Sequence, residues 1–289
     1  MQESLINSSF KYCEDLTKNH YENFPVASFL IPKDRRKYIY AIYAFARAAD
    51  DFADEPGIEG GKEKRLALLD EWNGKLNDCY SGKAYDPIFI ALGETVRDCN
   101  IPKELLENLL NAFGQDVKKS RYENFDEVLD YCKNSANPVG RLVLLVFDIH
   151  GDELFEKSDK ICTALQLANF WQDVKIDLQK DRIYIPKDDM ANFGVSVDDL
   201  VNKNDSKTFR DLIKYQAERT EKLFEEGKEL LKMLKKESVS KRLILELKLT
   251  WLGGMEILNK IRTIDYDVLH IRPKLNLIDK LKLLTKTLV

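Results

Sequence analysis

Hydrophobic residues recur at three- and four-residue intervals along most of the chain, which is the period of an α-helix. We expect long helices over residues 3–19, 35–54, 62–80, 158–178, 206–235 and 243–261. Pro87 and Pro102 each open a further helix, since proline is tolerated in a first turn, and Asp34 is placed to cap the second long helix. A short helix is predicted over 126–134, before a very apolar segment from 139 to 150. Because no alternating strand pattern accompanies these periods, the predicted fold class is all-α.

Little in the sequence interrupts the helical pattern. Only 13 Gly and 8 Pro occur among 289 residues, with no linker, low-complexity tract or further repeat. We therefore predict a single domain over residues 1–289. The segment 206–235 is highly charged and is expected to form an outer helix in contact with solvent.

Charge and cysteine content exclude several classes of protein. The formal net charge is −4 with both signs mixed, unlike the one-sided basic surface of a nucleic-acid-binding protein. Five scattered cysteines without a Cys-x-x-Cys pair favour a reducing, cytoplasmic location, and three dispersed histidines make a zinc site improbable. The start of the chain lacks a signal-peptide pattern, and the longest apolar run is far below the ~20 residues that cross a bilayer.

The amphipathic, basic segment 275–286 leaves two alternatives open. Packing onto the other helices is the commoner outcome for such a segment. Peripheral contact with the inner face of the cell membrane is the other.

Two pairs of aspartates share the same spacing inside otherwise apolar helical stretches. Asp50 and Asp54 form the first pair, and Asp173 and Asp177 the second. Four residues make about one helical turn, so each pair projects from one helix face, about 6 Å apart along the axis. Burying two carboxylates on one face is costly unless cations hold them there, and Mg²⁺ prefers oxygen ligands. The two pairs are therefore candidate ligands for Mg²⁺ and a phosphorylated substrate.

Further polar residues share these helix faces. Tyr43 and Arg47 lie on the face of the first pair, and Gln166 and Asn169 on that of the second. Such a polar stripe through an apolar helix more often lines a cavity than faces solvent. A surface stripe paired with lysines is the alternative. Asp51 could assist Asp50 or pair with a surface lysine, and we favour the lysine.

Aromatic residues are plentiful near both stripes. Breaking a carbon–diphosphate bond leaves a carbocation, which ring faces stabilise in a pocket that excludes water. For any single ring, packing in the core is the commoner role. The aromatic residues that could line such a pocket are Tyr12, Phe24, Phe29, Tyr40, Tyr43, Phe45 and Phe170.

The two aspartate-bearing segments, 43–54 and 166–177, resemble the two aspartate-rich signatures of the squalene/phytoene synthases. Residues 181–186 (Asp-Arg-Ile-Tyr-Ile-Pro) continue the second signature as they do in that family. The resemblance implies an isoprenoid-synthase helical bundle around a central cavity, with the two pairs facing each other. It also implies prenyl diphosphate substrates and Mg²⁺ held by Asp50, Asp54, Asp173 and Asp177.

The sequence departs from the pattern of phytoene-type members at two positions, and there it resembles the bacterial hydroxysqualene synthases. Gln172 stands where phytoene-type members carry arginine, and Lys133 follows the Tyr131-Cys132 pair, where those members commonly carry a tyrosine nearby. That subgroup takes presqualene diphosphate from a sister synthase, captures the rearranged cation with water and passes hydroxysqualene to a reductase in hopanoid biosynthesis. A head-to-head condensing synthase that makes phytoene, dehydrosqualene, squalene or presqualene diphosphate is the alternative. A non-catalytic helical scaffold is a third possibility.

These expectations assign roles to individual residues. The four aspartates hold Mg²⁺, Asn169 joins their polar network, and Gln166 orients water or a cation-facing group. The residues expected to contact substrate are Tyr43, Arg47, Lys133, Gln172 and Tyr184, with Arg182 as a further candidate.

Overall fold

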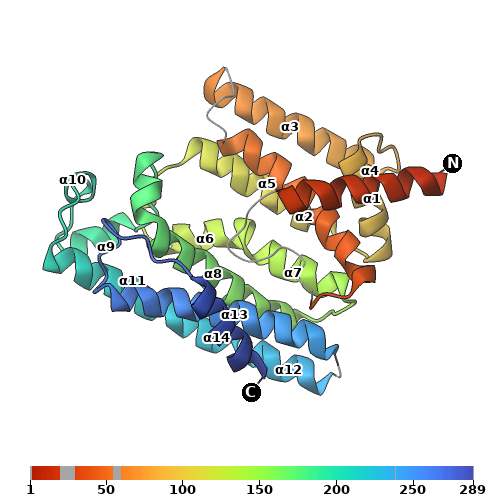
Figure 1. Ribbon diagram of the computed structural model, residues 1–289. Helices are drawn as coiled ribbons and strands as arrows, with labels where there is room; N and C mark the ends of the chain where they lie inside the picture. The colour runs from red at the N-terminus through yellow and green to blue at the C-terminus, as the bar shows by residue number, and fades with distance from the viewer. Residues whose placement is uncertain (1, 20–29, 55–59, 238, 289) are drawn as a thin grey trace. The chain divides into compact units, whose positions relative to one another are not determined.

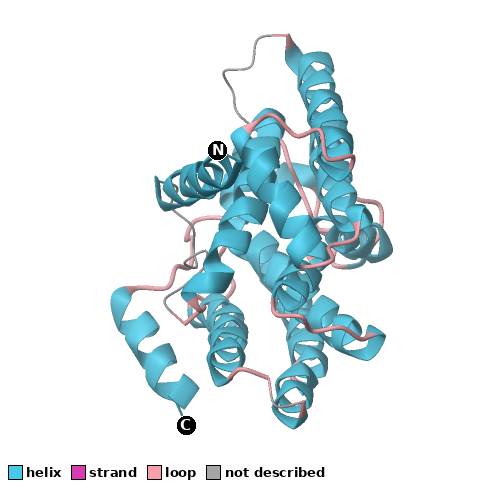
Figure 2. Ribbon diagram, turned by 90° about the vertical axis from the view of Figure 1, so that its right-hand side faces the viewer, coloured by secondary structure: helices cyan, strands magenta, loops and turns pink. Residues whose placement is uncertain are grey.

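A computed structural model describes residues 2–19, 30–54, 60–237 and 239–288, and the regular structure in these ranges is helical (Figure 1). The predicted all-α class is confirmed. Figure 2 shows the helices joined by loops, without strands in the described ranges. The helices are α1 (Gln2–Asn19), α2 (Lys33–Asp54), α3 (Gly61–Tyr80), α4 (Pro87–Asp98), α5 (Lys103–Lys118), α6 (Phe125–Ser135), α7 (Asn137–Val146), α8 (Asp152–Gln179), α9 (Lys187–Asn192), α10 (Val197–Val201), α11 (Lys207–Gly227), α12 (Glu229–Lys236), α13 (Lys241–Thr263) and α14 (Leu277–Leu288).

Most predicted helices are present, with differences at their ends. The predicted cap at Asp34 is wrong, because the N–H groups of Arg35 and Arg36 donate to the carbonyl of Pro32 and Asp34 lies within the first turn. The expected helix 206–235 is divided into α11 and α12 beside Gly227. A Cβ on Gly227 would lie 2.6 Å from Cγ1 of Ile161, so α11 closely approaches α8 at this point. The short helices α9 and α10 were not predicted.

The chain divides into two compact units, one comprising residues 1–118 and 138–155, the other residues 119–137 and 156–289. That residues 1–289 form a single domain stays a prediction. Among the described helices, none is both long enough and apolar enough to cross a membrane.

In the first unit, α2 packs against α1, α3, α4 and α5. Its buried face carries Phe45, whose ring centroid lies 6.2 Å from that of Trp72 and 5.9 Å from that of Phe89. Phe45 is fully buried, so it belongs to the core and does not line a pocket. Because Phe45 fixes the rotation of α2, Tyr43 and Arg47 are left on a half-buried face.

In the second unit, Trp171 fixes the rotation of α8. Its side chain is fully buried, and its Nε1–H donates to Oγ1 of Thr220 on α11 over 2.8 Å. Asp173 lies two residues further on, roughly 200° around the helix axis from Trp171. The packing of Trp171 therefore turns Asp173 away from the α8–α11 contact.

Candidate functional site

The first aspartate pair lies in the last two turns of α2, on the half-buried face that begins at Tyr43. Nη1 of Arg47 donates to Oδ2 of Asp50 over 3.2 Å, and its Nη2 donates to Oδ1 of Asp51. The expected surface lysine as partner of Asp51 is therefore wrong, since the partner is Arg47. Asp54 is half-buried at the C-terminal end of the helix.

Arg47 combines a stable positive charge with an unused donor. Burial opposes its charge, but the neighbouring carboxylates of Asp50 and Asp51 outweigh burial and raise the pKa of the guanidinium. Its Nε is buried and has no hydrogen-bond partner among the described residues. A guanidinium with a free buried N–H beside two carboxylates is suited to bind a phosphate oxygen.

The second aspartate pair lies on α8, whose helical geometry places the four residues of the stripe on one face, and that the stripe lines a cavity stays a prediction. Gln166, Asn169, Asp173 and Asp177 are all half-buried. Most of the apolar residues between them are buried, namely Leu167, Ala168, Phe170, Trp171 and Val174, whereas Ile176 is half-buried. The stripe is therefore a half-buried polar face on a part of α8 where most apolar residues are buried.

Arg272 joins this stripe from the segment that precedes α14. Its Nε donates to Oδ1 of Asp173 over 2.5 Å and its Nη2 donates to Oδ2 over 2.9 Å, a two-pronged arrangement. Arg272 was not among the predicted site residues, because it is 99 residues from Asp173 and belongs to no local pattern. Each aspartate pair therefore has a guanidinium beside it, Arg47 on α2 and Arg272 on the segment before α14.

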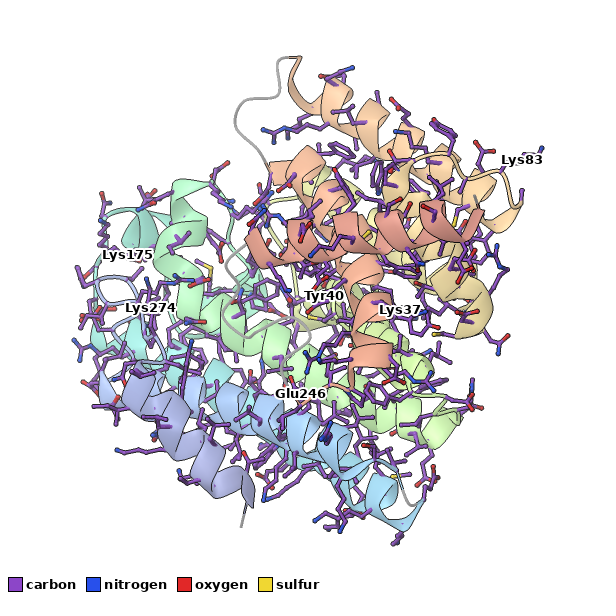
Figure 3. All side chains as sticks on the ribbon, turned by 45° about the vertical axis from the view of Figure 1, so that its right-hand side comes forward. Lys37, Tyr40, Lys83, Lys175, Glu246 and Lys274 are labelled. Carbon is purple, nitrogen blue, oxygen red and sulfur yellow. The ribbon has the colours of Figure 1, made fainter. Side chains whose placement is uncertain are left out.

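Two further contacts attach this segment to α8. The buried side chain of Gln172 donates from Nε2 to the carbonyl of Pro273 over 2.6 Å. Nζ of Lys175 donates to the carbonyl of His270 over 2.8 Å, and Figure 3 labels Lys175 and Lys274 on this part of the second unit. Gln172 therefore holds the backbone next to Arg272, while its expected contact with substrate stays a prediction.

An aromatic cluster adjoins the second pair. The Tyr184 ring stacks on Phe170 with centroids 3.7 Å apart and an interplanar angle of 8°. Tyr131 and Tyr122 contact the Tyr184 ring at centroid distances of 5.8 Å and 5.5 Å. The loop that carries Tyr184 is attached by the N–H of Ile183, which donates to the carbonyl of Ser120 over 2.9 Å. The expected role of Tyr184 at the diphosphate stays a prediction, as does that of Arg182.

The remaining expected site residues differ in how exposed they are. Lys133 is exposed on α6, and its contact with phosphate stays a prediction. Tyr12 is half exposed on α1, and Tyr40 is buried in the core of the first unit. Phe24 and Phe29 lie outside the described residues.

The donors at both pairs suit a hard divalent cation. Asp50 and Asp54 lie in the first unit and Asp173 and Asp177 in the second, and each pair offers carboxylate oxygens one helical turn apart. Carboxylate oxygens are the ligands that Mg²⁺ uses together with substrate phosphates. That all four carboxylates hold Mg²⁺ at one site stays a prediction.

Comparison with known proteins gives consistent results. The family model for squalene/phytoene synthase matches residues 17–279. A hydroxysqualene synthase from Zymomonas mobilis is 40% identical over 208 residues, which are 70% of this chain and 67% of that protein. A chloroplastic phytoene synthase from an Oncidium hybrid cultivar is 28% identical over 77% of this chain, and this chain spans 55% of its length.

Solved structures share the fold over nearly the whole chain. The crystal structure of squalene synthase HpnC from Alicyclobacillus acidocaldarius has a TM-score of 0.84 and 39% identity, covering 90% of this chain and 95% of that one. A dehydrosqualene synthase solved with a ligand has a TM-score of 0.86 and 26% identity, covering 99% and 98%. With a family match over most of its length and these relatives, the chain belongs to the squalene/phytoene synthase family of enzymes.

Proposed function

We propose that this enzyme converts presqualene diphosphate and water into hydroxysqualene and diphosphate, with Mg²⁺ as cofactor. The observation that carries the proposal is the ranking of relatives. Hydroxysqualene synthases from Zymomonas mobilis and Rhodopseudomonas palustris are 40% and 36% identical to this chain, whereas a phytoene synthase is 28% identical over a similar length. A presqualene diphosphate synthase would supply the substrate and a hydroxysqualene reductase would consume the product, as in hopanoid biosynthesis.

Charge at the two stripes supports diphosphate as the leaving group. Asp50, Asp54, Asp173 and Asp177 would hold the metal, which when bound neutralises charge on phosphate oxygens. Arg47 and Arg272 carry planar guanidiniums, which bind phosphate with paired N–H donors. The carbon–oxygen bond to diphosphate breaks with its electron pair leaving on diphosphate, and two cationic side chains favour that separation of charge.

Water must then reach the rearranged cation at one carbon only. Its oxygen forms the new bond and it loses one proton, so the reaction consumes no reductant. The half-buried amides of Gln166 and Asn169 lie one turn apart on the α8 stripe, where amide oxygens can accept hydrogen bonds from water. We assign Gln166 the task of orienting that water and Asn169 the task of supporting the polar network of Asp173.

A second candidate function has its own support. The dehydrosqualene synthase shares the fold over 99% of this chain, so a head-to-head condensation of two prenyl diphosphates is the alternative reaction. The two candidates differ in their substrates, since condensation begins with two diphosphates and the proposed reaction with one.

Substrate feeding separates the candidates. The purified protein is incubated with Mg²⁺, without NADPH, and with presqualene, farnesyl or geranylgeranyl diphosphate in turn, and organic products are identified by mass spectrometry. We expect an alcohol from presqualene diphosphate only. A C40 hydrocarbon from geranylgeranyl diphosphate would overturn the proposal. Unchanged diphosphate release in Asp50→Ala and Asp173→Ala, compared with the exposed control Asp70→Ala, would overturn the metal assignment.

A further inference from the structure

The two faces of α14 have opposite roles. On the inner face, Leu283 is 3% exposed and Thr287 is buried, and this face packs against α13. On the outer face, Leu277, Ile278 and Leu281 are 73%, 63% and 55% exposed. These three residues cover about one turn of the helix, so they form a contiguous patch, which we call the outer apolar patch.

Polar contacts at both ends keep the inner face on α13. Nζ of Lys260 lies 2.8 Å from Oδ2 of Asp279, and Nζ of Lys248 donates to the carbonyl of Thr287 over 3.1 Å. The N-terminal end is further fixed because Asn276 and Asp279 exchange backbone and side-chain hydrogen bonds of 2.7 Å and 2.9 Å. The direction in which the patch points is therefore set by specific contacts, and the exposure of three large apolar residues is a property of the docked helix.

The exposed charged side chains around the patch are lysines. Asp279 is the only acid of α14, and its carboxylate is turned toward Lys260 with 12% of the side chain exposed. Lys282 and Lys286 are exposed on α14, and Lys274 is exposed just before it. The outward surface therefore combines an apolar patch with cations at its border. A helix of this kind lies in the plane of a membrane interface, where apolar residues enter the acyl boundary and lysines meet anionic headgroups.

We propose that the outer apolar patch of α14, with Lys274, Lys282 and Lys286, docks this enzyme on the surface of an anionic lipid bilayer. Charge complementarity decides between a bilayer and a second copy of the chain, because two copies of this patch would place lysines against lysines. The docking surface also lies close in sequence to the candidate site. Residues 270–273, which contact Gln172, Asp173 and Lys175 of α8, are joined to α14 by only three residues.

Vesicle sedimentation tests the proposal without substrate, so its outcome does not depend on the proposed reaction. The unmodified chain is sedimented with vesicles of phosphatidylcholine alone and with vesicles containing about one third phosphatidylglycerol. We expect binding to the anionic vesicles that falls about fivefold for each of Lys274, Lys282 and Lys286 changed to Gln. Changing Leu277, Ile278 and Leu281 together to Ser should reduce binding by about tenfold or more.

A control set of variants tests whether the loss of binding is specific to α14. Leu5, Tyr85 and Val201 are exposed to a similar extent elsewhere, so changing these three to Ser should leave binding unchanged. The proposal is overturned if the unmodified chain does not bind anionic vesicles, if it binds both vesicle types equally, or if the control set loses as much binding as the α14 set. It is also overturned if sedimentation velocity shows that the α14 set separates a dimer while vesicle binding persists, which would make the patch an interface between copies.

Discussion

Replacing Arg272 by Met tests whether this residue controls access of a cation to Asp173. Arg272 occupies both carboxylate oxygens, at 2.5 Å and 2.9 Å, and the two side chains are 25% and 13% exposed. Hydrogen bonds to charged groups contribute about 1.5–3 kcal/mol each. Removing a unit positive charge about 4 Å away changes the energy of a divalent cation by up to about 8 kcal/mol at an effective dielectric constant of about 20. Since solvent screens part of this energy, we expect at least about 1.4 kcal/mol, a tenfold gain in cation affinity.

The assay is a titration with Mn²⁺, as a probe for Mg²⁺, by calorimetry in the absence of diphosphate. Arg272→Met should bind Mn²⁺ at least about tenfold more tightly than the unmodified enzyme, and bind inorganic diphosphate more weakly when the metal is present. Arg262→Met is the matched control, because it removes the same charge from a partly exposed ion pair with Glu221 in the same unit. Equal Mn²⁺ affinity in the two variants, or weaker binding in Arg272→Met, would show that Arg272 does not control access of a cation to Asp173.

Three further predictions concern metal, packing and pH. Asp50→Asn or treatment with EDTA should slow diphosphate release by about a hundredfold or more, and excess Mg²⁺ should restore only the EDTA-treated enzyme. Gly227→Ala should lower the free energy of unfolding by about 1–3 kcal/mol in urea titrations, because its Cβ would meet Ile161, whereas Gly74→Ala, with no atom within 4 Å, should not destabilise. The hydrogen bond from Lys260 holds the pKa of Asp279 below its usual value, so the stability from this pair should be present above about pH 4 and be lost as the pH falls further. Urea titrations at about pH 6 and about pH 3 should show a smaller loss in Lys260→Met than in the unmodified enzyme, and an equal loss would contradict this assignment.

Helix positions could be predicted because they depend on local period. Residues 62–80 were expected to be helical and α3 covers Gly61–Tyr80, since a helix buries one face through its own three- and four-residue spacing. The break between α11 and α12 could not be predicted in this way. It lies where Gly227 approaches Ile161, and that approach joins segments far apart in the sequence.

The same distinction between local helical spacing and contacts of distant segments applies to the candidate site. Spacing alone placed Asp173 and Asp177 on one face of α8 with Gln166 and Asn169, because neighbours on a helix are fixed by its geometry. Local signals also identified Arg47 beside Asp50, and the structure joins these two by a hydrogen bond.

By itself, the sequence determined that the chain is helical, which faces of its helices are polar and that these faces carry a family signature. The tertiary structure alone decided which partners those faces have. Arg272 reaches Asp173 across 99 residues, Gln172 binds the carbonyl of Pro273, and α14 turns three large apolar residues outward. The physical reason is that periodicity sets the direction of a side chain relative to its own helix, whereas the group it meets depends on how separate segments pack.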